Sequence, residues 1–381
     1  MDCEKIYYVN PMEKTFTATV TGCAETPKGF AVTLSATAFY PEGGGQACDL
    51  GRLGDATVLD VREQGDAIIH LCDRALEVGS TVEGVLDWDR RFDLMQQHTG
   101  EHILSGLIHR RFGWHNIGFH LGATTIQIDF DGPVSAEALA ELEEQANAVI
   151  WADLPVKCWY PDEETLPTIS YRSKKALAWP VRIVEIPGAD ICACCGTHLP
   201  TTGMVGVIKV LSAIKFHEGV RIEMVCGGRA LRYMTAVYEQ NRLVSQAFSA
   251  KILETGAAAQ KMNDALAAEK YRASGLQNRL FDYIAKDYVN QENILHFEPG
   301  LDGVGVRTLA EKLSAVCRGW CGVFSEKEGG FSYCFATREG DLRQLVKEMN
   351  TALGGRGGGK PQFQQGTVNA TEAQIRTFFH K

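Results

Sequence analysis

The sequence predicts an α+β protein of several parts, and three observations support this fold class. Short β-branched runs separated by Gly, Pro and Asp fill residues 1–88, which predicts a small β-barrel-like domain. Helix and strand patterns alternate over 89–228, which indicates an α+β core. Residues 229–290 lack proline and favour a long helical segment, and 291–381 return to an α/β pattern. A length of 381 residues agrees with more than one domain.

Apolar spacing and turn residues predict the individual helices and strands. The first domain is expected to hold strands at Phe16–Cys23, Phe30–Thr37, Thr57–Glu63, Ala67–Cys72 and Thr81–Asp87. The core is expected to hold helices at Arg90–Phe112 and at 135–151, the latter capped by Ser135, and strands at Arg182–Ile186, Val205–Val210 and Val220–Val225. The helical segment is expected to break near Thr255–Gly256. The last domain is expected to hold strands at Gly303–Val306, Cys321–Ser325 and Phe331–Ala336, helices at Thr308–Cys317 and Asp341–Leu353, then a Gly-rich loop and a short helix.

The formal net charge of −9 disfavours a nucleic-acid partner at first, but the charge is unevenly distributed. Residues 1–228 have 18 basic and 31 acidic side chains, a balance of −13. Residues 229–290 and 341–381 each have a balance of +3, and 291–340 have one of −2. Because phosphate contacts depend on local basic patches, we expect the chemistry in the N-terminal part and the polyanion on the C-terminal part. The alternative is that so mild an asymmetry has no functional meaning.

Other features of the sequence predict a cytoplasmic protein without a membrane partner. No apolar run approaches the roughly 20 residues that a membrane span needs. The N-terminus, MDCEKIYYVNPMEKTF, lacks the basic and apolar regions of a signal peptide. Twelve cysteines scattered over a large acidic chain indicate reduced thiols rather than disulfides.

Two histidines four residues apart, in the segment HTGEH, lie within the predicted helix. This spacing places His98 and His102 on one helix face, so their imidazoles can converge on one cation. The metalloprotease pattern requires Glu directly after the first His, where this chain has Thr99. Glu101 is expected to point elsewhere, so a protease is disfavoured. Taken alone, such a histidine pair is more often ordinary surface or core.

A cysteine-rich segment about 95 residues further on, CACCGTH, holds the remaining candidate ligands. Cys194 and His198 are again four residues apart, and Gly196 between them indicates a turn rather than a helix. Thiolate and imidazole ligands together favour Zn²⁺. Cys192 and Cys195 are neighbours of the site or alternate ligands, or else buried thiols.

The segment YPEGGGQ, which ends at Gln46, is a flexible stretch after a predicted strand. Gly43, Gly44 and Gly45 permit positive φ or a close approach of the backbone to a ligand. It is not a P-loop, since no Gly-Lys-Ser/Thr follows. The alternative is a hairpin loop of the barrel.

Three motifs together resemble those of a known family: FYPEGGGQACDLG, QQHTGEHILS and CCGTHLPTTG. In order and spacing they are similar to the Gly-rich motif and the paired HxxxH and CxxxH zinc motifs of the alanyl-tRNA synthetase editing domain. The segments WDRRFDLMQQHTGEH and VRIVEIPGADICACCGTH also fit, and the resemblance spans nearly the whole chain. Since the editing-type barrel begins at residue 1 and no aminoacylation domain is present, we expect a long, free-standing AlaX-type protein.

The resemblance implies a zinc-dependent hydrolase that acts in trans on mischarged tRNA(Ala), chiefly Ser-tRNA(Ala), with Gly-tRNA(Ala) as a second substrate. The zinc ligands that it implies are His98, His102, Cys194 and His198. Four protein ligands normally mark a closed structural site, so either the site expands to five ligands or one ligand yields to water or substrate.

The resemblance also places the Gly-rich motif, with Gly43, Gly44 and Gly45, at the border of the editing pocket. Thr37 and Gln46 are then candidates for contacting the aminoacyl group. A pocket that hydrogen-bonds the serine hydroxyl can cut serine and spare alanine, because the analogue without the hydroxyl leaves buried polar groups unpaired.

The C-terminal stretch LGGRGGGKP is expected to contact phosphate or RNA through backbone amides, Arg356 and Lys360. The alternative is a plain flexible loop. By resemblance, residues 291–381 look like the synthetase domain that recognises tRNA, and 229–381 are a candidate region for a homodimer contact.

Two other functions remain open. One is a metal-dependent phosphoesterase, because a related domain occurs in DHH phosphoesterases; Lys360 stands where their loop histidine is expected, and no Asp-His-His sequence is present. The other is a non-catalytic RNA-binding protein with a structural zinc, which only turnover of mischarged tRNA would separate from an editing enzyme.

Overall fold

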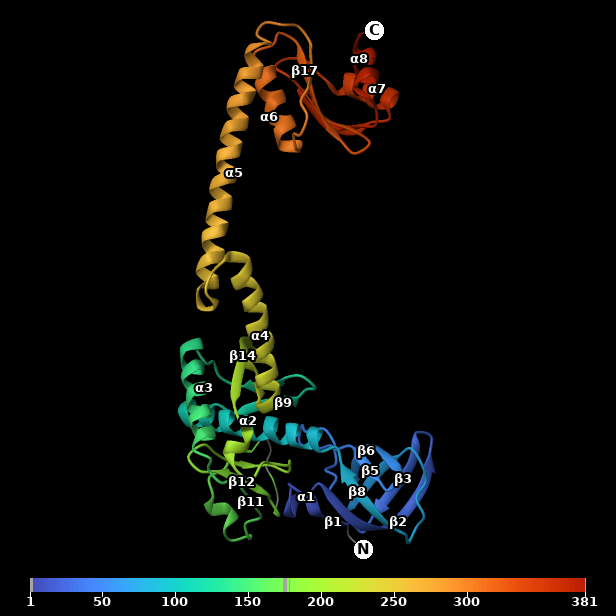
Figure 1. Ribbon diagram of the computed structural model, residues 1–381, viewed down its shortest axis with the longest axis vertical. Coiled ribbons are helices and arrows are strands. Elements are labelled where there is room, and N and C mark those ends of the chain that lie inside the picture. Colours follow the sequence, from blue (N-terminus) through green and yellow to red (C-terminus); the bar gives the residue numbers. More distant parts are fainter. Residues whose placement is uncertain (1–2, 174–176, 178, 381) are drawn as a thin grey trace. The chain divides into compact units, whose positions relative to one another are not determined.

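The computed structural model describes residues 3–173, 177 and 179–380 (Figure 1). The chain divides into two compact units, Met1–Leu243 and Val244–Lys381. Each unit combines helices with sheets and has its own hydrophobic clusters, so the chain is an α+β protein. None of the helices in the described residues is long and apolar enough to cross a membrane.

Six strands at the start of the first unit close into a barrel in the order β2-β3-β7-β6-β5-β8. Buried and exposed side chains alternate along the strands, as expected when one face of a sheet encloses a core. In β2 (Thr15–Thr26), Phe16, Ala18 and Val20 are buried and the residues between them are exposed. The other strands are β3 (Gly29–Leu34), β5 (Gly51–Leu53), β6 (Ala56–Gln64), β7 (Ala67–Cys72) and β8 (Thr81–Leu86). Strand β5 was not predicted, because a strand of three residues shows no period.

The predicted strand Phe30–Thr37 divides into β3 and the short β4 (Ala36–Thr37). Strand β4 pairs in parallel with β1 (Glu4–Lys5), which leads into the short helix α1 (Ile6–Val9). The Gly-rich motif therefore begins just after a strand that has already left the barrel ladder.

A buried ion pair joins the barrel to the helix that follows it. Arg91 is fully buried on α2 (Trp88–Phe112), and its Nε lies 2.9 Å from Asp49 Oδ2. The same carboxylate accepts the backbone N–H of Tyr40 at 2.6 Å. Since Tyr40 and Asp49 flank the Gly-rich motif, this pair holds both ends of that loop against α2.

Helix α2 begins at the N-cap Asp87, whose side chain accepts from the Arg90 N–H, and ends at Gly113 with φ 76°. It packs into a hydrophobic cluster with a four-stranded sheet of order β14-β15-β10-β9. The sheet consists of β9 (Asn116–Leu121), β10 (Ile126–Phe130), β14 (Ile208–Phe216) and β15 (Gly219–Cys226). Gly100 allows the approach, since a Cβ there would lie 2.3 Å from Cys226 Sγ.

The rest of the core is helix α3 (Ala136–Trp151) and a three-stranded sheet. Ser135 caps α3 as predicted, by accepting the Ala138 N–H. The sheet is β11 (Lys157–Trp159), β12 (Ile183–Ile186) and β13 (Asp190–Ala193); two single-turn 3₁₀ helices lie at Leu166–Thr168 and Thr202–Val205. The predicted strand Val205–Val210 is thus wrong at its start, because Val205 ends a 3₁₀ turn and β14 begins at Ile208.

The helical segment is α4 (Gly227–Phe248) followed by a 3₁₀ turn (Ile252–Glu254) and α5 (Thr255–Lys286). The break predicted near Thr255–Gly256 is confirmed, because α5 begins at Thr255. Ser249, with φ 50°, follows the last residue of α4.

The second unit is a five-stranded sheet with helices on both faces (Figure 1). The strands, in sheet order, are β16 (Ile294–Phe297), β17 (Trp320–Lys327), β18 (Gly330–Thr337), β20 (Phe363–Val368) and β19 (Arg356–Lys360). Cys321 and Val323 on one face of β17 pack with α5 and with α6 (Gly303–Ser314). Phe324 on the other face packs with α7 (Arg343–Leu353) and α8 (Glu372–Phe379).

Two predictions for this unit are wrong. Gly303–Val306 is the first turn of α6 and not a strand, because Asp302 caps it by accepting the Gly305 N–H. The Gly-rich stretch Arg356–Lys360 is not a loop but strand β19, which pairs antiparallel with β20. Its glycines permit close pairing, since a Cβ at Gly357 would lie 2.3 Å from Gln365 O.

Candidate metal centre

Four side chains converge in the first unit: His98, His102, Cys194 and His198. One ligand atom from each lies within 4.8 Å of the others. Cys194 Sγ lies 3.5 Å from both His98 Nε2 and His198 Nε2. Tetrahedral zinc with its usual bond lengths places sulfur and nitrogen ligands about 3.6 Å apart. The spacing of these donors therefore fits a single tetrahedral cation.

The local structure explains how the ligands meet. His98 and His102 lie one turn apart on α2, with ring centroids 5.2 Å apart. Cys194 and His198 come from the turn after β13, as Gly196 indicated. A Cβ at Gly196 would lie 2.1 Å from the His98 ring, so only glycine allows the turn to approach the helix this closely.

Hydrogen bonds fix which nitrogen of His98 faces the cluster. The backbone N–H of Thr197 donates to Gln46 Oε1 at 3.2 Å, which establishes that atom as the amide oxygen. His98 Nδ1 lies 2.9 Å from the same oxygen and must therefore carry the proton. Nε2 of His98 is left with its lone pair directed at Cys194. Gln46, predicted to touch the substrate, thus touches a ligand of the metal centre.

The other two histidines are held in the same way. His102 Nδ1 donates to Asp190 Oδ2 at 2.8 Å, and Arg172 holds that carboxylate with bonds of 2.7 and 2.8 Å. His198 Nδ1 lies 3.3 Å from the Thr99 hydroxyl oxygen. All three imidazoles therefore have Nδ1 engaged and Nε2 available to a cation, the arrangement that orients histidine ligands in metal sites.

Charge in the cluster also favours a cation. Burial opposes ionisation of Cys194, but His98, His102 and hydrogen bonds outweigh it and hold the pKa of the thiol well below its usual value. Burial and the neighbouring His98 lower the pKa of His198 to about 3. Although burial favours neutral His102, the Cys194 thiolate and Asp190 raise the pKa of that imidazole well above its ordinary value. The Cys194 thiolate and the neutral His198 are thus already in the forms that ligate metals, whereas His102 has to release its proton when a cation binds.

A cavity of about 440 Å³ opens on the cluster. Its lining includes His98, His102, Cys194, Glu101, Phe119 and Gly44. Glu101 is only 4% exposed, and its Oε1 accepts from the Ser105 hydroxyl at 2.6 Å and from Asn116 Nδ2 at 2.8 Å. Oε2 lies 3.9 Å from His102 Nε2, so one carboxylate oxygen is directed toward the ligands. The expectation that Glu101 points away from the metal ligands is wrong.

The Gly-rich motif borders this cavity through Gly44. Gly45 has φ 88°, and a Cβ there would lie 2.6 Å from the Phe119 ring, which itself stacks on His98 with centroids 5.3 Å apart. Gly43 pairs with Gln46 through two backbone hydrogen bonds of 3.1 and 2.9 Å. The glycines thus form a tight turn that inserts Gln46 between the barrel and the cluster.

Thr37 lies elsewhere in the first unit. It is fully buried at the barrel, where its Oγ1 lies 2.8 Å from His70 Nε2 and accepts the Phe39 N–H at 3.1 Å. His70 Nδ1 lies 3.1 Å from Val32 O, so Nε2 accepts the Thr37 proton. The structure therefore brings Gln46, but not Thr37, to the ligands.

The two remaining cysteines of the turn occupy different environments. Cys192 is half-buried and forms a second possible group with His102 and Asp190. Since Arg172 already binds both oxygens of Asp190, the four-residue cluster is the better cation site. Cys195 is exposed, although it also lines the cavity.

In the second unit, Arg356 and Lys360 are exposed on β19 and, four residues apart on a strand, share one face. A depression of about 350 Å³ beside Arg356 is lined also by Arg343 and Lys347. The positive charge around this depression makes it suitable for binding phosphate.

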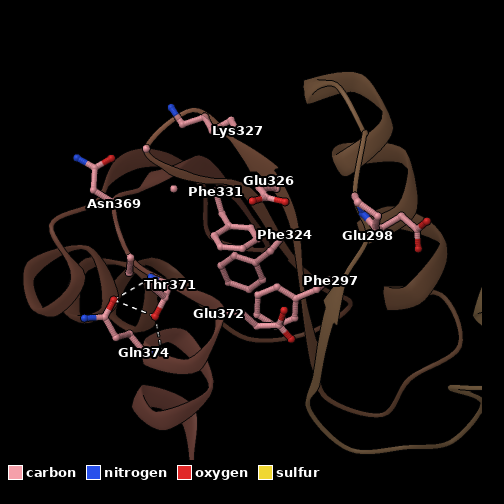
Figure 2. Close-up of a pocket in the computed structure, with 14 residues that line it drawn as sticks. Phe297, Glu298, Phe324, Glu326, Lys327, Phe331, Asn369, Thr371, Glu372 and Gln374 are labelled. Carbon is pink, nitrogen blue, oxygen red and sulfur yellow. Dashed lines mark hydrogen bonds between the residues drawn. The ribbon is translucent and has the colours of Figure 1, made fainter.

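Figure 2 shows a contrasting depression of about 680 Å³ in the same unit. Phe297, Phe324 and Phe331 group at its centre, and its rim has Glu298, Glu326, Glu372 and Lys327. The excess of carboxylates disfavours contact with a polyanion there.

Comparison with known proteins shows which proteins the chain is similar to. Residues 181–223, which include Cys194 and His198, match the family model described as the threonyl and alanyl tRNA synthetase second additional domain. Alanyl-tRNA editing protein Aarsd1 of Danio rerio is 29% identical over 92% of this chain and 87% of its own length. The Mus musculus protein of the same name is 31% identical over 66% of this chain and 65% of its own. The chain is thus similar to alanyl-tRNA editing proteins of the AlaX type.

Alanine–tRNA ligases match this chain over only part of their length. The alanine–tRNA ligase of Pyrococcus abyssi is 30% identical over 95% of the chain but 42% of the ligase. Across four such ligases the chain spans between 28% and 42% of their length. The chain corresponds to a part of these enzymes.

Sequence reasoning missed three residues at or beside the metal centre: Glu101, Asp190 and Arg172. Glu101 stood in the HTGEH motif, and the signal for it was Ser105 four residues later on the same helix face. Asp190 and Arg172 are bound to each other across 18 residues, and no local spacing indicates such a pair. Gly106 permits Asp190 to approach α2, since a Cβ there would lie 2.6 Å from Asp190 Cβ.

Proposed function

We propose that this protein is a zinc-dependent deacylase that hydrolyses mischarged tRNA(Ala), chiefly Ser-tRNA(Ala), with Gly-tRNA(Ala) as a second substrate. The observation that supports this most is the convergence of three Nε2 atoms and Cys194 Sγ beside a cavity that also holds Glu101. The Aarsd1 relatives are named as alanyl-tRNA editing proteins, which supports the same substrate class.

Zinc fits the donor set of three imidazoles and a thiolate better than the hard cations that prefer oxygen. His98, His102, Cys194 and His198 are the residues that would hold it. Bound Zn²⁺ supplies a Lewis acid that polarises the ester carbonyl. Gln46, Asp190 and Thr99 orient the imidazoles.

Glu101 is proposed to handle the proton. A water molecule in the cavity attacks the carbonyl carbon of the ester and gives a proton to Glu101 Oε2. The bond between that carbon and the ribose oxygen breaks, and the ribose oxygen receives the proton from Glu101. The products are the free amino acid and tRNA with its terminal hydroxyl restored. Ser105 and Asn116 hold Glu101 Oε1, so that Oε2 is presented to the cavity.

The second unit is proposed to bind the body of the tRNA. The exposed Arg356 and Lys360, with Arg343 and Lys347 nearby, form the basic face that supports this. Residues 229–381 remain a candidate region for a homodimer contact.

Deacylation of Ser-tRNA(Ala), Gly-tRNA(Ala) and Ala-tRNA(Ala) side by side tests the function. We expect rapid loss of serine and survival of alanine. Glu101→Gln should lower kcat by about 10²–10⁴-fold, the usual contribution of a positioned acid–base group, with zinc content unchanged. Glu144→Gln, an exposed change on α3, is the matched control. If zinc-loaded protein leaves Ser-tRNA(Ala) at its uncatalysed rate, the zinc is structural and the protein is not a deacylase.

A further inference from the structure

A second cavity of the first unit, about 740 Å³, adjoins the one at the metal centre. Its lining includes Trp88, Arg90, Phe92, Leu121, Arg229 and Arg232, which we name the arginine groove. The Gly-rich loop contributes Gly44 to one cavity and Ala47 to the other, and β9 contributes Phe119 and Leu121. Two residues that are two positions apart on a strand lie about 7 Å apart on the same face of the sheet. Since Phe119 lines one cavity and Leu121 the other, the two cavities are neighbours.

Two aromatic rings form one side of the arginine groove. Trp88 and Phe92 lie one turn apart on α2, with ring centroids 6.0 Å apart and planes inclined by 38°. Both pack partly against the core and are incompletely buried, so each keeps some ring surface at the groove. Lys14 Nζ lies 4.7 Å from the Trp88 ring. Partly exposed rings beside cations are surfaces on which unpaired bases can stack.

The arginines of the groove differ in what they bind. Arg229 is held by Asp93, with bonds of 3.0 Å from Nε, and by Gly122 O at 2.7 Å, so it has a structural partner. Within the part of the chain that the structure describes, the Arg90 side chain donates only through Nε, to Cys48 O at 3.1 Å. Arg232 is exposed on α4 and forms no ion pair with any residue that the structure describes. Two guanidinium groups are therefore available to an outside anion.

The groove is locally basic within a strongly acidic region. Arg229 and Asp93 neutralise each other, which leaves Arg90 and Arg232 of the lining, with Lys14 beside Trp88, against the single carboxylate of Asp89. Residues 1–228 as a whole have a balance of −13. The groove is therefore a local positive region on an acidic surface. A polyanion is attracted to the groove and repelled by the acidic side chains around it.

We infer that the arginine groove binds the unpaired 3′ end of the tRNA, with phosphates at Arg90 and Arg232 and a base on Trp88 and Phe92. This inference rests on the proposed function, because it delivers the ester at the end of that strand into the adjoining metal cavity. Unpaired RNA fits better than a duplex, since a duplex offers no free base face to the two rings. Substrate affinity is then shared between the two units, in contrast with the expectation that the polyanion lies on the C-terminal part.

Binding of a short unacylated RNA tests the inference independently of catalysis. The probe is a fluorescent single-stranded heptanucleotide with the 3′-terminal sequence of tRNA(Ala), measured by anisotropy with full-length protein. Trp88→Ala should weaken binding roughly 5- to 100-fold, the range for loss of one base stack, and Trp88→Phe should restore part of it. Arg232→Ala should weaken binding and reduce the salt dependence by about one phosphate contact, while Arg232→Lys retains most of it.

Arg242→Ala is the matched control, an exposed arginine on the same helix that pairs with Glu239. On Ser-tRNA(Ala), Arg232→Ala should raise KM while zinc content stays constant. Unchanged RNA binding and KM in both Arg232→Ala and Trp88→Ala, with normal deacylation, would overturn the inference and leave the proposed function intact. Wild-type protein that binds the RNA through Trp88 and Arg232 but never deacylates would support the groove and refute the reaction.

Discussion

The two glycine-rich stretches of this chain have similar compositions but different structures, since one is a tight turn and the other is a strand. Gly43–Gly45 form a tight turn in which Gly45 has φ 88° and touches Phe119, and the turn inserts the buried Gln46 beside His98. Gly357–Gly359 form an exposed strand in which Gly358 has no atom near the position of a Cβ. The first stretch uses glycine to bring a side chain into a crowded site. The second uses it to pair closely with β20 and display Arg356 and Lys360.

This difference teaches where glycine matters in the molecule. In the first unit, a Cβ at Gly45, Gly100, Gly106 or Gly196 would strike a neighbouring element, and the close approaches that these glycines allow bring the metal centre together. In the second unit, Gly357 and Gly359 allow close pairing with β20, whereas Gly358 faces open space. Changes at the first stretch should therefore act on chemistry, and changes at the second on affinity.

The largest effect is expected at the ligands that the first stretch supports. His98→Ala with His102→Ala should remove the metal and lower hydrolysis of Ser-tRNA(Ala) by on the order of 10³-fold or more, because the main electrostatic stabilisation is lost. Zinc content by mass spectrometry and the deacylation rate are the measurements. His120→Ala, an exposed histidine, is the control. Stoichiometric zinc in the double variant would exclude this ligand set.

Next in size is the direct comparison of two glycines, Gly45→Ala and Gly358→Ala. The first should lower kcat/KM by about 10- to 100-fold, since it disturbs the contact of Gln46 with a metal ligand. It should also cost about 1–3 kcal/mol of stability, because alanine is strained at that φ. Gly358→Ala should change stability by less than about 0.5 kcal/mol. Equal effects on activity would show that the two stretches do not differ in role.

Selectivity is expected to respond more modestly. Gln46→Ala and Thr37→Val should each be assayed for the ratio of deacylation rates on Ser-tRNA(Ala) and Ala-tRNA(Ala). We expect at least one of them to reduce the ratio by about tenfold, a part of the range that a hydroxyl contact can provide. Zinc content separates a lost substrate contact from a lost metal. If neither variant moves the ratio, the hydroxyl of serine is recognised elsewhere in the cavity.

The smallest effect is expected at the second stretch. Arg356→Ala with Lys360→Ala should raise KM a few-fold and flatten the logarithmic salt dependence by about two phosphate contacts, with kcat unchanged. Kinetics on Ser-tRNA(Ala) over a salt series are the measurement, and Arg338→Ala is a control in the same unit. A change in kcat without a change in salt dependence would contradict a role in phosphate binding.

Much of the fold was predictable where periodicity is strong. Helix α3 and most barrel strands have clear apolar spacing, and the break before α5 followed from composition. Strand β19 was not predictable, because its identity depends on pairing with β20 rather than on its own residues. The first turn of α6 was mistaken for a strand because Gly303–Val306 reads as β, whereas the cap from Asp302 decides it.

The same distinction between local patterns and long-range contacts applies to the candidate site. The i, i+4 spacing of His98 and His102 is local and was visible in the sequence. The bonds that orient these rings join residues 52 and 88 positions apart, His98 to Gln46 and His102 to Asp190. Such contacts form only when the barrel and the three-stranded sheet pack against α2. Local residue spacing in the sequence therefore does not predict them.

The central claim is that the His/Cys cluster of the first unit is the centre of a metal-dependent ester hydrolase. The most direct test is to measure Ser-tRNA(Ala) deacylation before and after removal of metal by a chelator, and again after one equivalent of Zn²⁺ is restored. The account predicts loss of hydrolysis on removal and its return with zinc, in proportion to the metal bound. Full activity in metal-free protein that is still folded by circular dichroism would contradict it.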